Sequence, residues 1–142
     1  KKVGNTLVTF LQIECVVRVN TKNDSVALYE LQFGDNDQLS ARVAKLIEAD
    51  LLVVLTSVPG LRGPDSSSEN DIVKLVENLD DVLGFADNSV GKLSVGGMQS
   101  KLESLRIALD AGIEAIIASG ENPEQLGKLV RGEGFGTRFR PR

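Results

Sequence analysis

The apolar run from Leu51 to Thr56 (LLVVLT) constrains the fold of this chain more than any other feature. It is continuous rather than alternating, so neither face of a strand built from it is suited to water. Such runs are typical of strands that helices cover on both faces, as in parallel sheets. We therefore predict that residues 51–56 form a central strand of a sheet flanked by helices.

Apolar residues at helical spacing predict four helices along the chain. The third begins at Gly97 and ends before Gly112, a glycine placed where a helix should close. The fourth starts at Asn122-Pro123, in the favoured order of cap and proline, and runs to about Arg131. The first two carry their apolar faces on Val3, Leu7, Phe10 and Leu11, and on Leu39, Val43, Leu46 and Ile47.

Strand patterns lie between these helices. Residues 15–19 and 113–119 are predicted strands, and residues 136–140 are predicted to form a last strand at the edge of the sheet. Residues 72–79 and 80–87 fit either a strand or a short helix. This alternation predicts an α/β fold, a three-layer αβα sandwich with a mostly parallel sheet.

Composition excludes several classes of function. The chain has 142 residues, a formal net charge of −4, no histidine and one cysteine, Cys15. Basic residues are scattered rather than concentrated, so we do not expect nucleic acid as a partner. Zinc clusters, disulfide frameworks and histidine-based nucleophilic catalysis are excluded. No apolar run reaches the roughly 20 residues of a membrane span, and no signal-peptide pattern opens the chain, so we expect a cytoplasmic location.

Two segments carry candidate phosphate chemistry. The first is Gly34-Asp35-Asn36-Asp37, before the second predicted helix, and the other is the segment from Gly96 to Lys101 (GGMQSK), which opens the third. Amides at a helix start attract anions, and a lysine can neutralise charge that develops on a transferred group. Alone, the first segment is a helix cap with solvated carboxylates and the second a turn with a solvated lysine. Together they favour phosphoryl transfer, with Lys101 as the best candidate for direct catalysis.

Polar residues follow three of the predicted strands, at positions 20–24, 56–57 and 119–122. In open α/β sheets, ligands bind outside the carboxyl ends of the strands. We therefore expect these three clusters to converge. By contrast, the terminal arginines Arg138, Arg140 and Arg142 and the pair Asp80-Asp81 are expected to be solvated charges without a functional role.

The chain resembles the glutamate 5-kinases of the amino acid kinase superfamily. Its matching segments keep the family's order and spacing over almost the whole chain, which corresponds to the later part of that kinase domain. We therefore expect residues 1–142 to form a single, partial amino acid kinase domain. The segments are Asn5-Thr6-Leu7, Asn23-Asp24-Ser25-Val26, residues 33–41 (FGDNDQLSA), residues 51–56, Gly96-Gly97-Met98 with Lys101, and Ala111-Gly112-Ile113.

The resemblance implies ATP-dependent phosphorylation of the γ-carboxylate of L-glutamate to glutamyl 5-phosphate, the first step of proline biosynthesis. It also implies Mg²⁺ dependence and a homo-oligomer. By this resemblance Lys101 stabilises the transferring phosphoryl group and Asp37 orients the catalytic lysines, while no residue is assigned as a metal ligand. The implied binding residues are Asp24, Asp35 and Asn36 for glutamate, and Thr56, Ser57, Val95, Gly96, Gly97, Met98, Gln99, Ser100 and Lys101 for ATP.

Several positions depart from the family pattern. Lys22 replaces an acid near Asp24, Ser57 replaces the acid that follows the central strand, and Val95 stands where threonine is common. The family's amino-terminal lysine-glycine strand end and its Ser-Gly phosphate loop are not in this chain.

Three explanations stay open: an ordered fragment of a longer enzyme, which we expect, a truncated product without activity, or a half that works with a separate partner. The alternative function is a noncatalytic kinase remnant or binding module. A related kinase acting on another carboxylate, carbamate or nucleotide phosphate is a further alternative.

Overall fold

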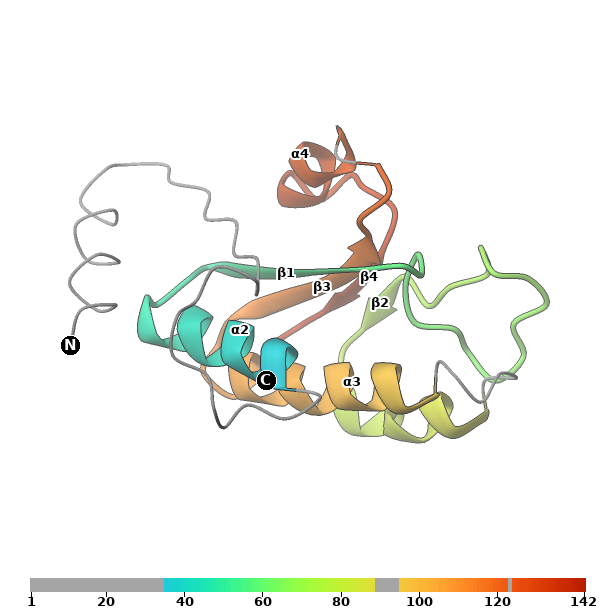
Figure 1. Ribbon diagram of the computed structural model, residues 1–142, viewed down its shortest axis with the longest axis horizontal. Coiled ribbons are helices and arrows are strands. Elements are labelled where there is room, and N and C mark those ends of the chain that lie inside the picture. Colours follow the sequence, from blue (N-terminus) through green and yellow to red (C-terminus); the bar gives the residue numbers. More distant parts are fainter. Residues whose placement is uncertain (1–34, 89–94, 123) are drawn as a thin grey trace.

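The computed structural model describes residues 35–88, 95–122 and 124–142, which form a sheet with helices on both faces (Figure 1). The helix predicted over residues 3–13, the strand predicted over residues 15–19 and Asp24 lie outside the described residues. The elements in chain order are α2 (Asp35–Leu46), β1 (Leu51–Thr56), β2 (Leu75–Val76), the 3₁₀ helices η2 (Leu79–Asp81) and η3 (Leu83–Asn88), α3 (Val95–Leu109), β3 (Glu114–Ser119), α4 (Glu124–Val130) and β4 (Thr137–Phe139).

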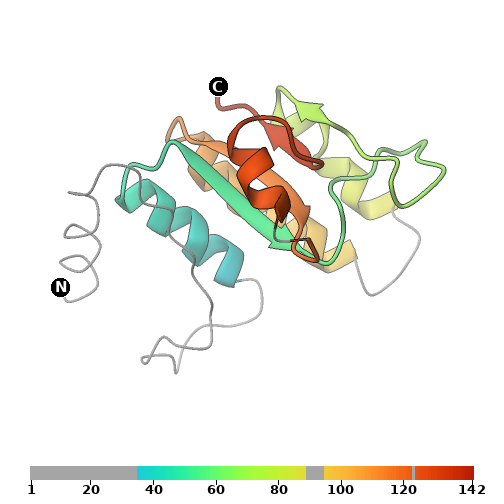
Figure 2. The ribbon, with the colours of Figure 1, turned by 90° about the horizontal axis from the view of Figure 1, so that it is seen from above.

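The four described strands form one mixed sheet in the order β1-β3-β4-β2. β1 and β3 are parallel, with Leu51 opposite Glu114 at one end and Thr56 opposite Ser119 at the other. β4 runs antiparallel to β3 and parallel to β2. Helices α2 and α3 cover one face of this sheet and α4 covers the other, as the two views show (Figures 1 and 2). The predicted three-layer α/β class with a mostly parallel sheet is confirmed.

Strand order differs from the prediction at one place. β4, predicted at an edge, lies between β3 and β2. β3 has a neighbour on each side, and its Ala115, Ile116, Ile117 and Ala118 are all buried. Among the described strands β1 pairs with β3 alone, and because the strand predicted over residues 15–19 lies outside the described residues, the central position of β1 stays a prediction. Apolar composition indicates how deeply a strand is buried but not which strands lie beside it, and this is why the position of β4 was wrong.

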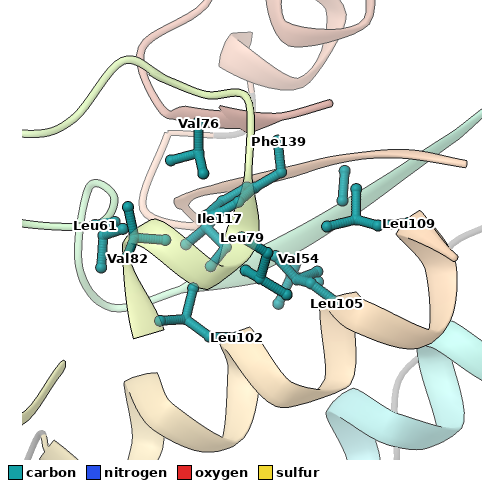
Figure 3. Packing of buried hydrophobic residues seen from close by; sticks show 11 residues of the cluster. Val54, Leu61, Val76, Leu79, Val82, Leu102, Leu105, Leu109, Ile117 and Phe139 are labelled. Atoms are coloured by element: carbon teal, nitrogen blue, oxygen red, sulfur yellow. The ribbon is translucent and has the colours of Figure 1, made fainter. Parts of the chain in front are cut away.

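The main core lies between α3 and the sheet (Figure 3). Leu102, Leu105 and Leu109 project from one face of α3 toward Ile117 of β3 and Phe139 of β4. The helix predicted to begin at Gly97 is thus confirmed, although it starts at Val95. It ends at Leu109, before Gly112 as predicted, and the Gly112 φ of 79° is a backbone conformation that glycine adopts without strain.

The buried face of α2 was predicted wrongly. Ala41 and Ala44 are its buried residues, whereas Leu39 is 40% exposed and Leu46 is 65% exposed. The two alanines pack with Ala108 of α3 in a separate small cluster. Small side chains allow the two helices to approach closely, and this contact turns the leucine stripe of α2 away from the described core.

The two ambiguous segments are irregular. Residues 72–79 contain an isolated bridge between Arg62 and Ile72 and the two-residue strand β2, and residues 80–87 are mostly 3₁₀ helix. Two further predictions for this half of the chain are confirmed. β3 covers residues 114–119, and α4 begins after Asn122, whose side chain accepts a hydrogen bond from the Glu124 amide at 3.2 Å.

The carboxyl-terminal arginines form ion pairs, which the prediction did not include. Arg140 and Arg142 are 59% and 63% exposed, so they are solvated as predicted, whereas Arg138 is 28% exposed. Arg138 binds Glu114, Arg140 Nη1 lies 3.2 Å from Glu77 Oε1, and Arg142 binds Asp80. Asp80 also accepts a hydrogen bond from Arg106 of α3. The last residues of the chain are thereby joined to β3, to η2 and to the segment between β2 and η2.

Asp80 makes the stability of the fold depend on pH. The Arg106 hydrogen bond, with help from the charge of Arg142, lowers the pKa of the Asp80 carboxyl below its ordinary value of 3.8. A lowered pKa in the folded state means that this contribution to stability is fully present above pH 3.8 and is lost as the pH falls through the lower folded-state value.

We therefore expect Asp80→Asn to lower the Tm at neutral pH and to have progressively less effect below about pH 4. Thermal unfolding of the full-length protein between pH 7 and pH 3 measures this, with Asp65→Asn, at an exposed loop aspartate, as the control. A Tm difference that is constant over this range would contradict the assignment.

Candidate functional site

The carboxyl ends of β1 and β3 meet, as the polar clusters predicted. Thr56 lies opposite Ser119, and the Gly120 amide donates a hydrogen bond to the Thr56 carbonyl at 2.9 Å. Helices α2 and α3 both begin at this end of the sheet in the two views (Figures 1 and 2). Two of the three predicted polar clusters therefore converge here, and the third, residues 20–24, lies outside the described residues.

An ion pair joins the first turn of α2 to the second turn of α3. Lys101 Nζ donates a hydrogen bond to Asp37 Oδ2 at 2.9 Å, across 64 residues of sequence. The side chains are 20% and 19% exposed. Partial burial strengthens the attraction between these charges relative to a surface pair, because less water screens them. The structure thus brings together the two residues that the sequence analysis assigned to catalysis.

The first turn of α3 supplies backbone amides rather than a wall of side chains. Gly97 is exposed, and a Cβ built on it would meet nothing within 4 Å, so the space beside it is open. Met98 packs against the main core. The amides of this turn have no partner within the helix, and together with the helix dipole they favour an anion. Phosphate groups fit this end of the helix.

The remaining ATP-binding candidates differ in what they offer. Gln99 donates its side-chain amide to Glu103 at 3.0 Å, and the Ser100 carbonyl accepts the Ser104 hydroxyl at 2.7 Å, so both residues support α3 itself. Thr56 ends β1, half-buried, and Ser57 follows it, exposed.

Of the glutamate-binding candidates, Asp35 and Asn36 begin α2, and Asp24 lies outside the described residues. Val95 and Gly96 begin α3.

The part of the chain that the structure describes contains neither a cluster of metal-binding side chains nor a membrane-spanning helix. No three acidic or cysteine side chains gather there as metal ligands. None of the helices in that part is both long enough and apolar enough to cross a bilayer.

Thr137 was missed in the sequence analysis. Its hydroxyl accepts a hydrogen bond from the Leu61 amide at 2.8 Å, and the residue is fully buried in β4. The available signal was a hydroxyl at an inward-facing position of a predicted strand, since a buried hydroxyl normally has a hydrogen-bond partner. Its partner lies 76 residues away, so no local pattern identifies it.

Comparison with known proteins agrees with this architecture. The profile of the amino acid kinase family matches residues 6–119. The chain is 44% identical over 143 residues to the glutamate 5-kinase of Dehalococcoides mccartyi strain CBDB1, covering 96% of this chain and 38% of that protein. It is 46% identical over 127 residues to the glutamate 5-kinase of Shewanella amazonensis, covering 87% of this chain and 34% of that protein.

Among solved structures, N-acetylglutamate synthase from Neisseria gonorrhoeae, complexed with coenzyme A and N-acetyl-glutamate, superposes with a TM-score of 0.59 at 22% identity. This match covers 75% of this chain and 23% of that one. At this identity the likeness concerns the fold alone. The chain spans 38% and 34% of the two glutamate 5-kinases, which is less than half of their length.

The half-buried position of Lys101 and Asp37 predicts a measurable coupling between them. In a double-mutant cycle with Asp37→Asn and Lys101→Met, we expect a coupling free energy of unfolding of about 1 kcal/mol. The control is the exposed pair Arg131 and Glu133, whose side chains are 63% and 66% exposed with 3.8 Å between Nε and Oε2, and whose coupling should be near zero. Equal couplings in the two cycles would contradict the effect of burial.

Proposed function

Because the chain belongs to the amino acid kinase family, we propose that the protein it represents transfers a phosphoryl group from ATP to the γ-carboxylate of L-glutamate. The product would be glutamyl 5-phosphate, for proline biosynthesis. Support comes from glutamate 5-kinases that are about 44% identical over 96% of this chain. Since the chain covers 38% of such a relative, we propose that residues 1–142 are a partial kinase domain that supplies part of the active site.

The ion pair between Lys101 and Asp37 is the observation that carries this proposal. Phosphoryl transfer depends on positioning and on neutralising charge more than on covalent help from the protein. An ammonium held by a carboxylate on a neighbouring helix has lost much of its rotational freedom. Lys101 can thus stabilise the charge on the transferring group without reorganising first.

The amides that open α3 are proposed to bind the phosphates of ATP, with Thr56 and Ser57 beside the nucleotide. ATP brings the phosphoryl group that is transferred. Mg²⁺ is the expected counterion, and its ligands would be mainly phosphate oxygens and water, since no acidic cage exists among the described residues. Among the described residues, the proposed contribution to neutralising the phosphates is therefore the α3 backbone amides and the Lys101 cation.

Asp24, Asp35 and Asn36 are proposed to bind glutamate. A carboxylate is a suitable partner for the α-ammonium group, and an asparagine amide can donate to the substrate's carboxylate. A cytoplasmic location and assembly into a homo-oligomer belong to the same proposal.

A noncatalytic kinase remnant is the second candidate function, because of specific substitutions. Ser57 replaces the acid that the family has after this strand, and Lys22 places a positive charge near Asp24. Calorimetry separates the two candidates: a kinase binds MgATP and glutamate, whereas a remnant binds neither or only one, without turnover. The protein to test is the product of the longest natural open reading frame.

We expect Lys101→Ala in that full-length protein to lower kcat by at least about 10²-fold, because it removes a charge that stabilises the transition state. The fold should persist, since the side chain lies at the open end of α3 rather than in a core cluster. Steady-state kinetics and circular dichroism measure the two effects. Lys128→Ala, at an exposed position of α4 on the other face of the sheet, is the control. Unchanged turnover in Lys101→Ala would exclude the assigned role.

Asp24→Ala should weaken glutamate binding more than MgATP binding, because its carboxylate is proposed to contact only the amino acid. Separate titrations with each ligand measure this. Equal losses for both ligands would point to a folding defect and against a glutamate site.

A further inference from the structure

The loop that follows β1 is fixed to β4 at Leu61. The Leu61 amide donates to Thr137 Oγ1 at 2.8 Å, and its carbonyl accepts the Val73 amide at 2.8 Å. The Leu61 side chain is 1% exposed and belongs to the main core, where Figure 3 shows it beside Val82. Three separate interactions therefore hold this one residue of the loop.

Two glycines make the contact with β4 unusually close. A Cβ on Gly60 would lie 2.6 Å from Thr137 Oγ1 and 3.2 Å from the Thr137 amide nitrogen. A Cβ on Gly136 would lie 2.8 Å from the Ile117 carbonyl oxygen of β3. The loop backbone on one side and β3 on the other thus enclose Gly136 and Thr137.

Residues 57–60 are consequently held at both ends. At one end the Gly120 amide binds the Thr56 carbonyl at 2.9 Å, and at the other Thr137 binds the Leu61 amide. Ser57, exposed, lies within this short span. Only three residues separate Leu61 from Ser57, so we expect a displacement of the Leu61 backbone to move Ser57 as well.

We propose that Thr137 is a positioning residue for nucleotide binding: its hydroxyl holds the loop from Ser57 to Leu61 in the conformation that presents Thr56 and Ser57 to MgATP. This inference rests on the proposed kinase function, and Thr137 itself touches no substrate. The competing explanation is that Thr137 only fills space in the core. The two differ in whether the hydroxyl or the volume of the side chain matters.

Thr137→Val and Thr137→Ser separate hydroxyl from volume. Valine keeps the shape but leaves the buried Leu61 amide without an acceptor, which is the costly way to lose a hydrogen bond. Serine keeps the acceptor and loses a methyl group. In the full-length protein we expect Thr137→Val to raise the KM for MgATP about tenfold, with kcat and the KM for glutamate changed less than about twofold. Thr137→Ser should keep the KM for MgATP within about twofold of the wild type.

Two further measurements exclude a general effect of stability. Leu129, on α4, belongs to a different core cluster. The variant Leu129→Val should therefore lower Tm without changing the KM for MgATP. Amide hydrogen exchange should accelerate at Leu61 in Thr137→Val and stay slow in Thr137→Ser. If Thr137→Val does not fold, Gly60→Ala disturbs the same contact from the loop side and should raise the KM for MgATP with the hydroxyl still present.

The outcomes distinguish this inference from the proposed function. A wild-type protein that neither binds nor turns over MgATP would overturn both, even if exchange at Leu61 is slow. A normal wild type with an unchanged KM for MgATP in Thr137→Val, or in Gly60→Ala where that variant replaces it, would overturn only the positioning role. Equal increases in the KM for MgATP in Thr137→Val and Thr137→Ser would also overturn the positioning role, since the side-chain volume would then be the cause.

Discussion

The close contact between α2 and α3 is the constraint on which the candidate site depends. On α2, Asp37, Ala41 and Ala44 share one face at spacings of four and three residues. On α3, Lys101, Ser104 and Ala108 share one face in the same way. The alanines pack together in a small cluster where the two helices are close. The ion pair lies nearer the amino-terminal ends of both helices. A larger side chain at either buried alanine would separate the helices and with them the two charges.

The sequence predicted the parts of the fold that are signalled locally. α3 has apolar residues at regular spacing and a glycine at its end, so its length and buried face were correct. The buried face of α2 was not, because alanine is both a good helix former and a weak apolar signal, and the leucine stripe masked it. The edge position of β4 was wrong for a different reason: the neighbours of a strand depend on pairing between distant segments, which the composition of a single strand does not record.

The same division applies to the site. Lys101 and Asp37 could be identified because each belongs to a motif with a recognised chemistry, and the structure adds that they touch. Thr137 and the terminal arginines had no such motif. In β4, Thr137 and Phe139 face inward and are buried, while Arg138 between them reaches Glu114 on β3. The alternation of inward and outward residues along β4 could be seen in the sequence. The hydrogen-bond and ion-pair partners of these residues could not, because they lie on distant segments of the chain.

Charge balance limits what the described residues could contribute to the proposed site. The pair of Lys101 and Asp37 carries no net charge, and the amides that open α3 add only about half an elementary charge. A bound triphosphate carries several negative charges, and charge shifts further onto the leaving group during transfer. More positive charge than these two features provide is therefore required, from Mg²⁺ and from groups beyond the described residues. On the proposed function, the described residues would therefore contribute one positioned lysine and the amides that open α3, and further cations would have to balance the rest of the charge.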